Sequence, residues 1–251
     1  MATQKKLEKA LIHERNQILD VLRQTSFFQF DPEVYHKQII PYATYAPWEG
    51  DSEFMHIYNQ VKNNTLVDIY RCYELWSLAK ELAGTEGDIL EVGVWRGGTG
   101  AILAKASETS LRTAVYLADT FEGVVKATEN DTVYRGGEHS DTSQEEVQSL
   151  LNAVNAKNYK LLKGIFPDDF VNEINIEKIK LCHIDVDTFL SAKDIFEYAW
   201  EKLSVGGVVV FDDYGFWTCE GVTKYFNGLN ISNGRRFYNV NGHGIIVKIS
   251  P

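Results

Sequence analysis

Two pairs of aspartates stand where the hydrophobic pattern predicts that strands end. Asp185 and Asp187 end the segment CHIDVD, and Asp212 and Asp213 end the segment VVVFDD. Side chains alternate along a strand, so Asp185 and Asp187 point to one side, and open α/β sheets bind ligands at this carboxyl edge. Four like charges need compensation, which favours a hard divalent cation such as Mg²⁺ with oxygen ligands. The alternative is that several of these aspartates cap the helices predicted after them.

A glycine-rich turn, DILEVGVWRGGTG over residues 88–100, joins a predicted strand to a predicted helix. Such a turn places backbone N–H groups and a helix N-terminus beside a ligand. The dinucleotide fingerprint needs a second glycine close to the pyrophosphate, but Trp95 fills that position. S-adenosylmethionine, which has an adenosine and no pyrophosphate, fits the altered pattern better, with Glu91 able to face its sulfonium or amino end. A turn that only packs the helix against the strand is the alternative.

Two later segments could complete a cofactor site. Asp119 follows the next predicted strand, where an acidic residue in a doubly wound fold accepts hydrogen bonds from ribose hydroxyls. It could equally cap the turn that follows. Gly164, Ile165 and Phe166 could form an apolar slot for adenine, or they could simply pack in the core.

The histidines and cysteines indicate little further chemistry. His183 fits a packed histidine better than a ligand, and His139 fits an exposed loop residue, although it could reach a substrate. Cys72, Cys182 and Cys219 are odd in number, far apart and without a CxxC pair, which is typical of reduced packing residues. The lack of a Cys/His set also disfavours zinc.

The chain from residue 88 onward alternates between strand and helix patterns. Strands are predicted at 88–93, 114–118, 159–163, 178–184 and 206–211, and helices at 97–107, 142–156, near 168–173, 190–203 and 219–228. This alternation predicts an α/β fold with a doubly wound, mostly parallel sheet. Two closing strands, at 236–240 and 244–249, flank Asn241 and Gly242, a hairpin signal that makes the last strand antiparallel. The loop at 122–140 is long enough to act as a lid.

The N-terminal quarter of the chain has a different pattern. Residues 4–24 predict an amphipathic helix, suited to packing or dimerisation, with apolar residues on one side at helical spacing: Leu7, Leu11, Ile18, Val21 and Leu22. The aromatic-rich segment that follows indicates an ordered cap. A further helix should begin at Asn64 or Thr65 and end at Gly84. We therefore expect a helix and aromatic cap at 1–62 and a Rossmann-like domain at 63–251 that carries the lid insertion 122–140.

Composition limits the class of protein. The 251 residues are 44% hydrophobic and 24% charged, which disfavours a disordered, collagen-like or disulfide-scaffold chain. The formal net charge is −10 and no basic block is present, so we expect no nucleic acid or anionic membrane as a partner. The charged N-terminus resembles neither a signal peptide nor a membrane span, so we expect a cytoplasmic protein.

Five segments together resemble the macrocin O-methyltransferase family. They are EVGVWRGG at 91–98, ADTFEG at 118–123, GIFP at 164–167, IDVD at 184–187 and LSVGGVVVFDDYG at 203–215. The resemblance implies a class I, Rossmann-like methyltransferase fold. It also implies methylation of hydroxyls on the sugars of macrolide, aminocoumarin and enediyne natural products, with S-adenosylmethionine and Mg²⁺.

The same resemblance assigns roles to single residues. It implies that Asp185, Asp212 and Asp213 bind the metal and that Asp187 is the general base. Some relatives use a nearby histidine, which the residues after Asp187 do not offer here, so His139 and Asp141 of the lid are the reserves. The implied cofactor contacts are Thr65, Glu91, Gly93, Asp119, Thr120, Gly164, Ile165 and Phe166.

Other acceptors and functions remain open at this point. The aromatic residues of the N-terminal segment (Phe27, Phe28, Tyr42, Tyr45 and Trp48) also suit a catechol-type O-methyltransferase. A non-catalytic cofactor-binding protein of the same fold is a further alternative, which the complete set of aspartates disfavours. An NAD-linked oxidoreductase is disfavoured by Trp95. The expected partner is a small-molecule glycoside, and the amphipathic helix suggests a homodimer or larger homo-oligomer.

Overall fold

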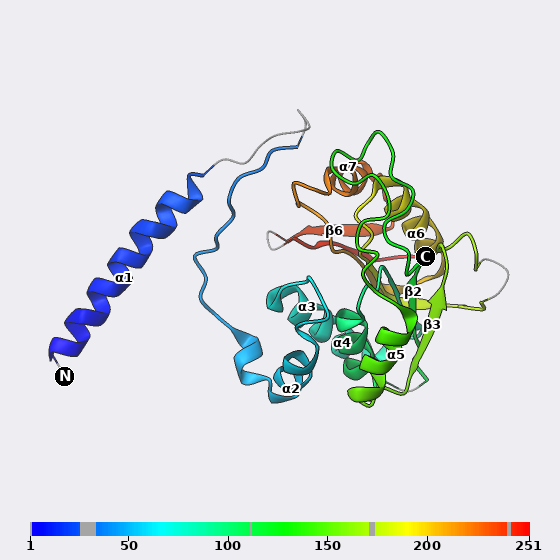
Figure 1. Ribbon diagram of the computed structural model, residues 1–251, viewed down its shortest axis with the longest axis horizontal. Coiled ribbons are helices and arrows are strands. Elements are labelled where there is room, and N and C mark those ends of the chain that lie inside the picture. Colours follow the sequence, from blue (N-terminus) through cyan, green and yellow to red (C-terminus); the bar gives the residue numbers. More distant parts are fainter. Residues whose placement is uncertain (1, 26–33, 111, 171–173, 240–241) are drawn as a thin grey trace. The chain divides into compact units, whose positions relative to one another are not determined.

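The computed structural model describes residues 2–25, 34–110, 112–170, 174–239 and 242–251. The chain divides into two units, Met1–Tyr45 and Ala46–Pro251. The first unit contains the predicted N-terminal helix, α1 (Ala2–Arg23), drawn in dark blue in Figure 1. At its end, Arg23 lies 3.5 Å from the ring centroid of Tyr42 and donates a 3.0 Å hydrogen bond to the carbonyl of Ile40. The apolar side of α1, including Leu7 and Ile18, is exposed within this unit.

The second unit is built on a seven-stranded sheet with the order β3-β2-β1-β4-β5-β7-β6. The strands are β1 (Asp88–Val92), β2 (Val115–Asp119), β3 (Tyr159–Lys163), β4 (Ile179–Ile184), β5 (Leu203–Phe211), β6 (Gly234–Tyr238) and β7 (Gly244–Lys248). The first five strands in chain order pair in parallel, whereas β7 is antiparallel to both β5 and β6. The predicted doubly wound sheet with an antiparallel last strand is therefore confirmed.

Helices cover both faces of this sheet (Figure 1). They are α2 (Ser52–Val61), α3 (Ile69–Glu81), α4 (Gly98–Ala106), α5 (Gln144–Ala153), α6 (Phe189–Lys202) and α7 (Glu220–Gly228), with short 3-10 helices at Pro47–Gly50 and Leu82–Gly84. Side chains alternate along β1, so buried Ile89 packs with α2 to α5, and buried Leu90 packs with α6 and α7. Two apolar layers thus form the core. No helix among the described residues is long and apolar enough to cross a membrane.

The region before β1 differs from the sequence prediction. Helix α2 was not predicted, and because Phe54 and Val61 are fully buried in the core, the second unit begins before the expected boundary at residue 62. Helix α3 begins after Asp68, whose carboxylate accepts hydrogen bonds from the amides of Tyr70 and Arg71. Asn64 and Thr65 are therefore not its caps. The cap is instead Asp68, a short polar side chain that follows them in the sequence.

Two smaller predictions have mixed outcomes. The short helix expected near 168–173 is absent from its described part, where residues 166–170 form hydrogen-bonded turns and residues 171–173 lie outside the described chain. The hairpin strands are present as β6 and β7, but residue 241 of the predicted turn also lies outside the described residues.

The insertion 122–140 packs against the rest of the second unit. Its two ends pair through hydrogen bonds from Val124 N to Glu138 O and from Gly137 N to Val124 O, both 2.8 Å. Buried Asp131 accepts a 2.8 Å hydrogen bond from the amide of Phe189, the first residue of α6, and another from the amide of Thr128. Helix α6 has no side-chain cap from its own N-cap residue, so the insertion supplies one.

Replacing this cap should destabilise the unit. We expect Asp131→Ala to lower the free energy of unfolding by about 1–3 kcal/mol, because the amides of Phe189 and Thr128 lose a charged acceptor. Urea denaturation followed by circular dichroism measures the change. Glu129→Ala, at an exposed position of the same insertion, is the matched control, and equal stability of the two variants would contradict this role.

Candidate active site

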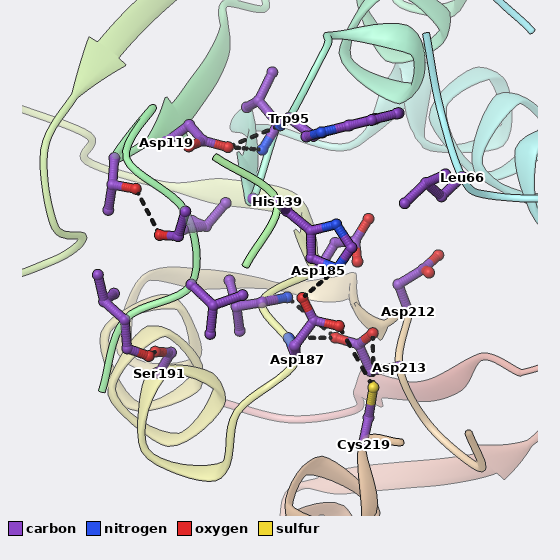
Figure 2. A pocket seen from close by; sticks show the side chains of 18 of the residues that line it. Leu66, Trp95, Asp119, His139, Asp185, Asp187, Ser191, Asp212, Asp213 and Cys219 are labelled. Carbon is purple, nitrogen blue, oxygen red and sulfur yellow. Dashed lines mark hydrogen bonds and ion pairs between the residues drawn. The ribbon is translucent and has the colours of Figure 1, made fainter. Parts of the chain in front are cut away.

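A cavity opens at the carboxyl ends of β1, β2, β4 and β5 (Figure 2). The strand register explains why the predicted residues meet there. Val92 of β1 pairs with Ile184 of β4, and Ile184 pairs with Phe211 of β5, so the residues that follow these three strands stand side by side. Predicted site residues line the cavity: Thr65, Gly93, Asp119, Thr120, Gly164, Ile165, Phe166, Asp185, Asp187, Asp212 and Asp213.

Glu91 has a different environment from the one expected. Its side chain is fully buried and does not line the cavity. Glu91 is the register partner of His183 on the neighbouring strand, and its Oε1 lies 2.9 Å from His183 Nδ1. The sequence did not show this pairing, because the register of β1 against β4 decides it.

The glycine-rich turn passes close to the end of β4. A Cβ on Gly93 would lie 1.5 Å from the carbonyl oxygen of Asp185, and the φ angle of Gly93 is +91°, so only glycine fits. Asp119 holds the turn, because its Oδ2 accepts hydrogen bonds from the amides of Val94 (2.7 Å) and Trp95 (2.8 Å). Its Oδ1 accepts one from the amide of Phe121 at 2.7 Å. A carboxylate has about four acceptor positions, which leaves room for one ribose hydroxyl.

Three of the carboxylates converge on one point. Asp185, Asp212 and Asp213 each offer an oxygen within 4.8 Å of the others. Desolvation raises the pKa of Asp185, and the charges of Asp212 and Asp213 raise it further. Desolvation and the charge of Asp212 also raise the pKa of Asp213. A set of oxygen donors with uncompensated negative charge fits a hard divalent cation, which these three residues would hold.

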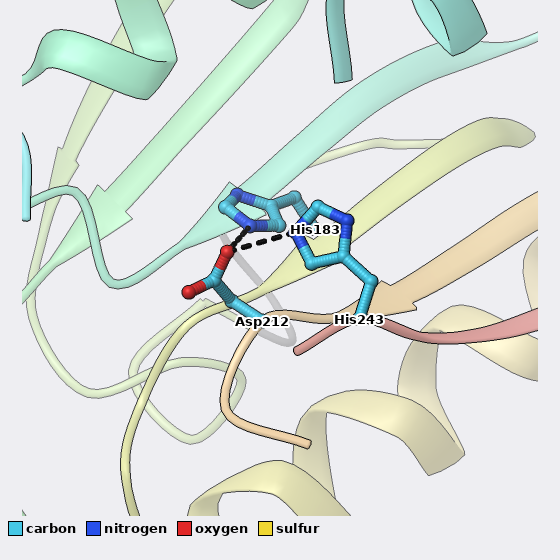
Figure 3. A group of neighbouring side chains, drawn as sticks. All are labelled: His183, Asp212 and His243. Atoms are coloured by element: carbon cyan, nitrogen blue, oxygen red, sulfur yellow. Dashed lines mark hydrogen bonds and ion pairs between the residues drawn. The ribbon is translucent and has the colours of Figure 1, made fainter. Parts of the chain in front are cut away.

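Asp212 differs from its neighbours because a guanidinium and two imidazoles contact it, and Figure 3 shows the two imidazoles. Buried Arg71 of α3 forms an ion pair with Oδ2, and Nε2 atoms of His183 and His243 lie 3.3 and 3.0 Å from Oδ1. Desolvation alone would raise the pKa of Asp212, but the charge of Arg71 and the two imidazoles hold this pKa well below its usual range. Burial would likewise lower the pKa of His183, yet Asp212 and Glu91 raise it to about 10.

The predicted base, Asp187, faces the insertion. Its Oδ2 lies 3.9 Å from Nε2 of His139, which is itself 3.3 Å from the hydroxyl of Tyr134. Its Oδ1 lies 3.5 Å from Sγ of Cys219. Desolvation and the charge of Asp213 raise the pKa of Asp187, against hydrogen bonds from Tyr134 and Cys219 that lower it.

The two reserve residues of the insertion separate in space. His139 lines the cavity, whereas Asp141 does not. Asp141 instead pairs with Arg96 at 2.6 Å and accepts a 2.9 Å hydrogen bond from Nε1 of Trp95. Arg71, His243 and Tyr134 were not singled out in the sequence, because no motif marks them and their contacts depend on the fold.

Comparison with known proteins first defines the class of fold. The solved structure of the O-methyltransferase NovP aligns with a TM-score of 0.65 and 22% identity, covering 75% of this chain and 83% of that chain. The fold is therefore that of the class I methyltransferases. The family model of the macrocin-O-methyltransferases (TylF) matches residues 63–234, which is well over half of the chain. The chain belongs to this family.

Two curated relatives are similar over the same region. Mycinamicin III 3''-O-methyltransferase of Micromonospora griseorubida is 31% identical over 165 residues, which are 60% of this chain and 64% of that protein. An 8-demethyl-8-(2,3-dimethoxy-alpha-L-rhamnosyl)-tetracenomycin-C 4'-O-methyltransferase of Streptomyces olivaceus is 29% identical over 160 residues, 58% of this chain and 59% of that protein. The chain thus spans less than two thirds of the length of each relative.

The raised carboxylate pKa values predict how stability depends on a cation. Without a cation, a raised carboxylate pKa favours the folded state only while the carboxylates are protonated. The stability that they contribute is present below their ordinary pKa of 3.8 and is lost as the pH rises through their raised pKa values. Mg²⁺ should therefore raise the melting temperature more at about pH 8 than at about pH 5. At 100 times its Kd, the bound cation would add about 2.7 kcal/mol to the free energy of unfolding.

Thermal unfolding with and without Mg²⁺ at both pH values measures this effect. The double variant Asp185→Asn/Asp213→Asn should lose it. Asp168→Asn, at an exposed residue paired with Lys126, should keep it. An equal response of the parent protein and the double variant to Mg²⁺ would exclude a cation at these carboxylates.

Proposed function

We propose that this protein is an S-adenosylmethionine-dependent O-methyltransferase that uses Mg²⁺ to methylate a sugar hydroxyl of a glycosylated natural product. Membership of the macrocin-O-methyltransferase family supports the reaction. The names of the two relatives, which specify O-methylation of mycinamicin III and of a rhamnosyl-bearing tetracenomycin, support the class of acceptor.

The observation that carries this proposal is the meeting of two features in one cavity. The turn at Gly93, held by Asp119, lies at the end of β1 and β2, and the carboxylates of Asp185, Asp187 and Asp213 lie beside it. One side fits an adenosine-bearing cofactor and the other side fits a cation and a hydroxyl. S-adenosylmethionine would supply the methyl group there and leave as S-adenosylhomocysteine.

The other roles in the proposed reaction belong to side chains of this protein. Asp185, Asp212 and Asp213 would hold the divalent cation, whose positive charge lowers the pKa of a nearby hydroxyl. Asp187 would accept the proton of that hydroxyl, and desolvation, the largest cause of its raised pKa, favours proton uptake there. The insertion, through Val124, Tyr134 and His139, forms a wall of the cavity that limits access of water to the reacting groups.

One of the aromatic residues that suggested a catechol acceptor lies away from the cavity. This residue, Trp48, packs against Tyr70 and Tyr73 at centroid distances of 5.0 and 6.3 Å and does not line the cavity. Phe27 and Phe28 lie outside the described residues. The names of the curated relatives favour a sugar hydroxyl, which we keep as the proposed acceptor.

Replacing the base tests the chemistry. Asp187→Asn should lower single-turnover methyl transfer by about 10²–10⁴-fold, because the amide cannot accept the proton, and should leave the Kd for S-adenosylmethionine within about twofold of the parent value. Rapid-quench assays and isothermal titration calorimetry measure the two quantities. Asp141→Asn, which changes an aspartate outside the cavity, should transfer at nearly the parent rate. Parental turnover by Asp187→Asn would reject this residue as the base.

A panel of acceptors tests substrate class and cation together. Demethylated macrolide glycosides should accept label from methyl-labelled S-adenosylmethionine, while simple catechols should not. Chelation by EDTA should abolish transfer, and Mg²⁺ should restore it. Transfer that is preferred to catechols would overturn the acceptor, and transfer that survives chelation would overturn the cation.

A further inference from the structure

Two buried imidazoles flank Asp212 (Figure 3), and each also contacts a glutamate. His183 lies 2.9 Å from Glu91 through Nδ1 and 3.3 Å from Asp212 through Nε2. His243 lies 2.5 Å from Glu74 through Nδ1 and 3.0 Å from Asp212 through Nε2. Both histidine side chains are fully buried. The result is a chain of five side chains with alternating carboxylates and imidazoles, centred on Asp212.

These contacts leave Asp212 almost no freedom. A carboxylate has about four acceptor positions. The two imidazole Nε2 atoms occupy those of Oδ1, and Arg71 occupies one on Oδ2. One position therefore remains, on Oδ2. Rotation of the carboxylate to use another position would break at least one contact with a buried imidazole or guanidinium, which is costly in a desolvated site.

Of the two histidines that contact Asp212, His243 lies in a part of the sequence that the family match does not include. The match ends at residue 234, and His243 immediately precedes β7. Glu74 stands on α3 and is 29% exposed. Its Oε2 also accepts a 2.7 Å hydrogen bond from the side-chain amide of Asn239, so two residues near the β6–β7 connection hold the same oxygen.

We propose that His243, oriented by Glu74, is a positioning residue that sets the Asp212 carboxylate for the divalent cation, with His183 and Glu91 as its counterpart. This inference rests on the cation of the proposed function. Groups that orient a metal ligand from behind commonly change metal affinity by about 10–100-fold when they are replaced. His243 touches neither acceptor nor cofactor in this role and acts only through Asp212.

Direct binding of Mn²⁺ to the purified full-length chain tests the proposal without any assay of turnover. Free Mn²⁺ is measured by its electron paramagnetic resonance signal. His243→Leu, which removes both ring nitrogens, should raise the Kd for Mn²⁺ by about 10–100-fold. His243→Gln should bind more tightly than His243→Leu, because its amide keeps a donor for Asp212. Glu74→Ala should weaken binding by about tenfold.

Glu81→Ala is the matched control, at an exposed glutamate on the last residue of the same helix; it should bind Mn²⁺ like the parent. Thermal unfolding of each variant establishes that it is folded, and Glu74→Ala decides the matter if His243→Leu does not fold. Parent-like Mn²⁺ affinity in folded Glu74→Ala and His243→Leu would overturn the positioning role and leave the cation in place. Absence of Mn²⁺ binding by the parent would overturn the cation itself, and the positioning role with it.

Discussion

Carboxylates that gather at one edge of a sheet lose their hydration and repel one another. The arrangement of this site follows from that electrostatic cost. The structure compensates them unequally. Asp212 contacts Arg71, His183 and His243, and Oδ2 of Asp213 accepts hydrogen bonds from the amides of Val186 and Asp187. The pKa values of Asp185, Asp187 and Asp213 stay raised. The uncompensated negative charge is therefore concentrated on these three residues.

The parallel register of the sheet turns this electrostatic pattern into a site. Because Val92, Ile184 and Phe211 are level in β1, β4 and β5, the glycine turn and both aspartate pairs follow at the same height. The close approach of Gly93 to the carbonyl of Asp185 joins the two halves directly. A side chain at residue 93 would push apart the ends of β1 and β4, which carry the proposed cofactor and cation sites.

Much of this could be predicted from local pattern, and the rest depends on contacts between distant residues. The doubly wound sheet, its antiparallel end and the family are confirmed, whereas the helix predicted near 168–173 is absent from its described part. The roles of single site residues remain predictions, although their convergence could be predicted because parallel strands end at one edge. Arg71 was missed because it is 141 residues from Asp212 and lies in a helix whose pattern predicts only packing. The burial of Glu91 against His183 could not be predicted either, because sequence spacing does not give the register of parallel strands.

The insertion has two functions that cannot be separated. It forms a wall of the cavity through Tyr134 and His139, and through Asp131 it satisfies the first amide of α6. A displacement of Asp131 would therefore uncover that amide and loosen the first turn of the helix. The rate at which the Phe189 amide exchanges with deuterium therefore reports how often the contact between the insertion and this helix end breaks.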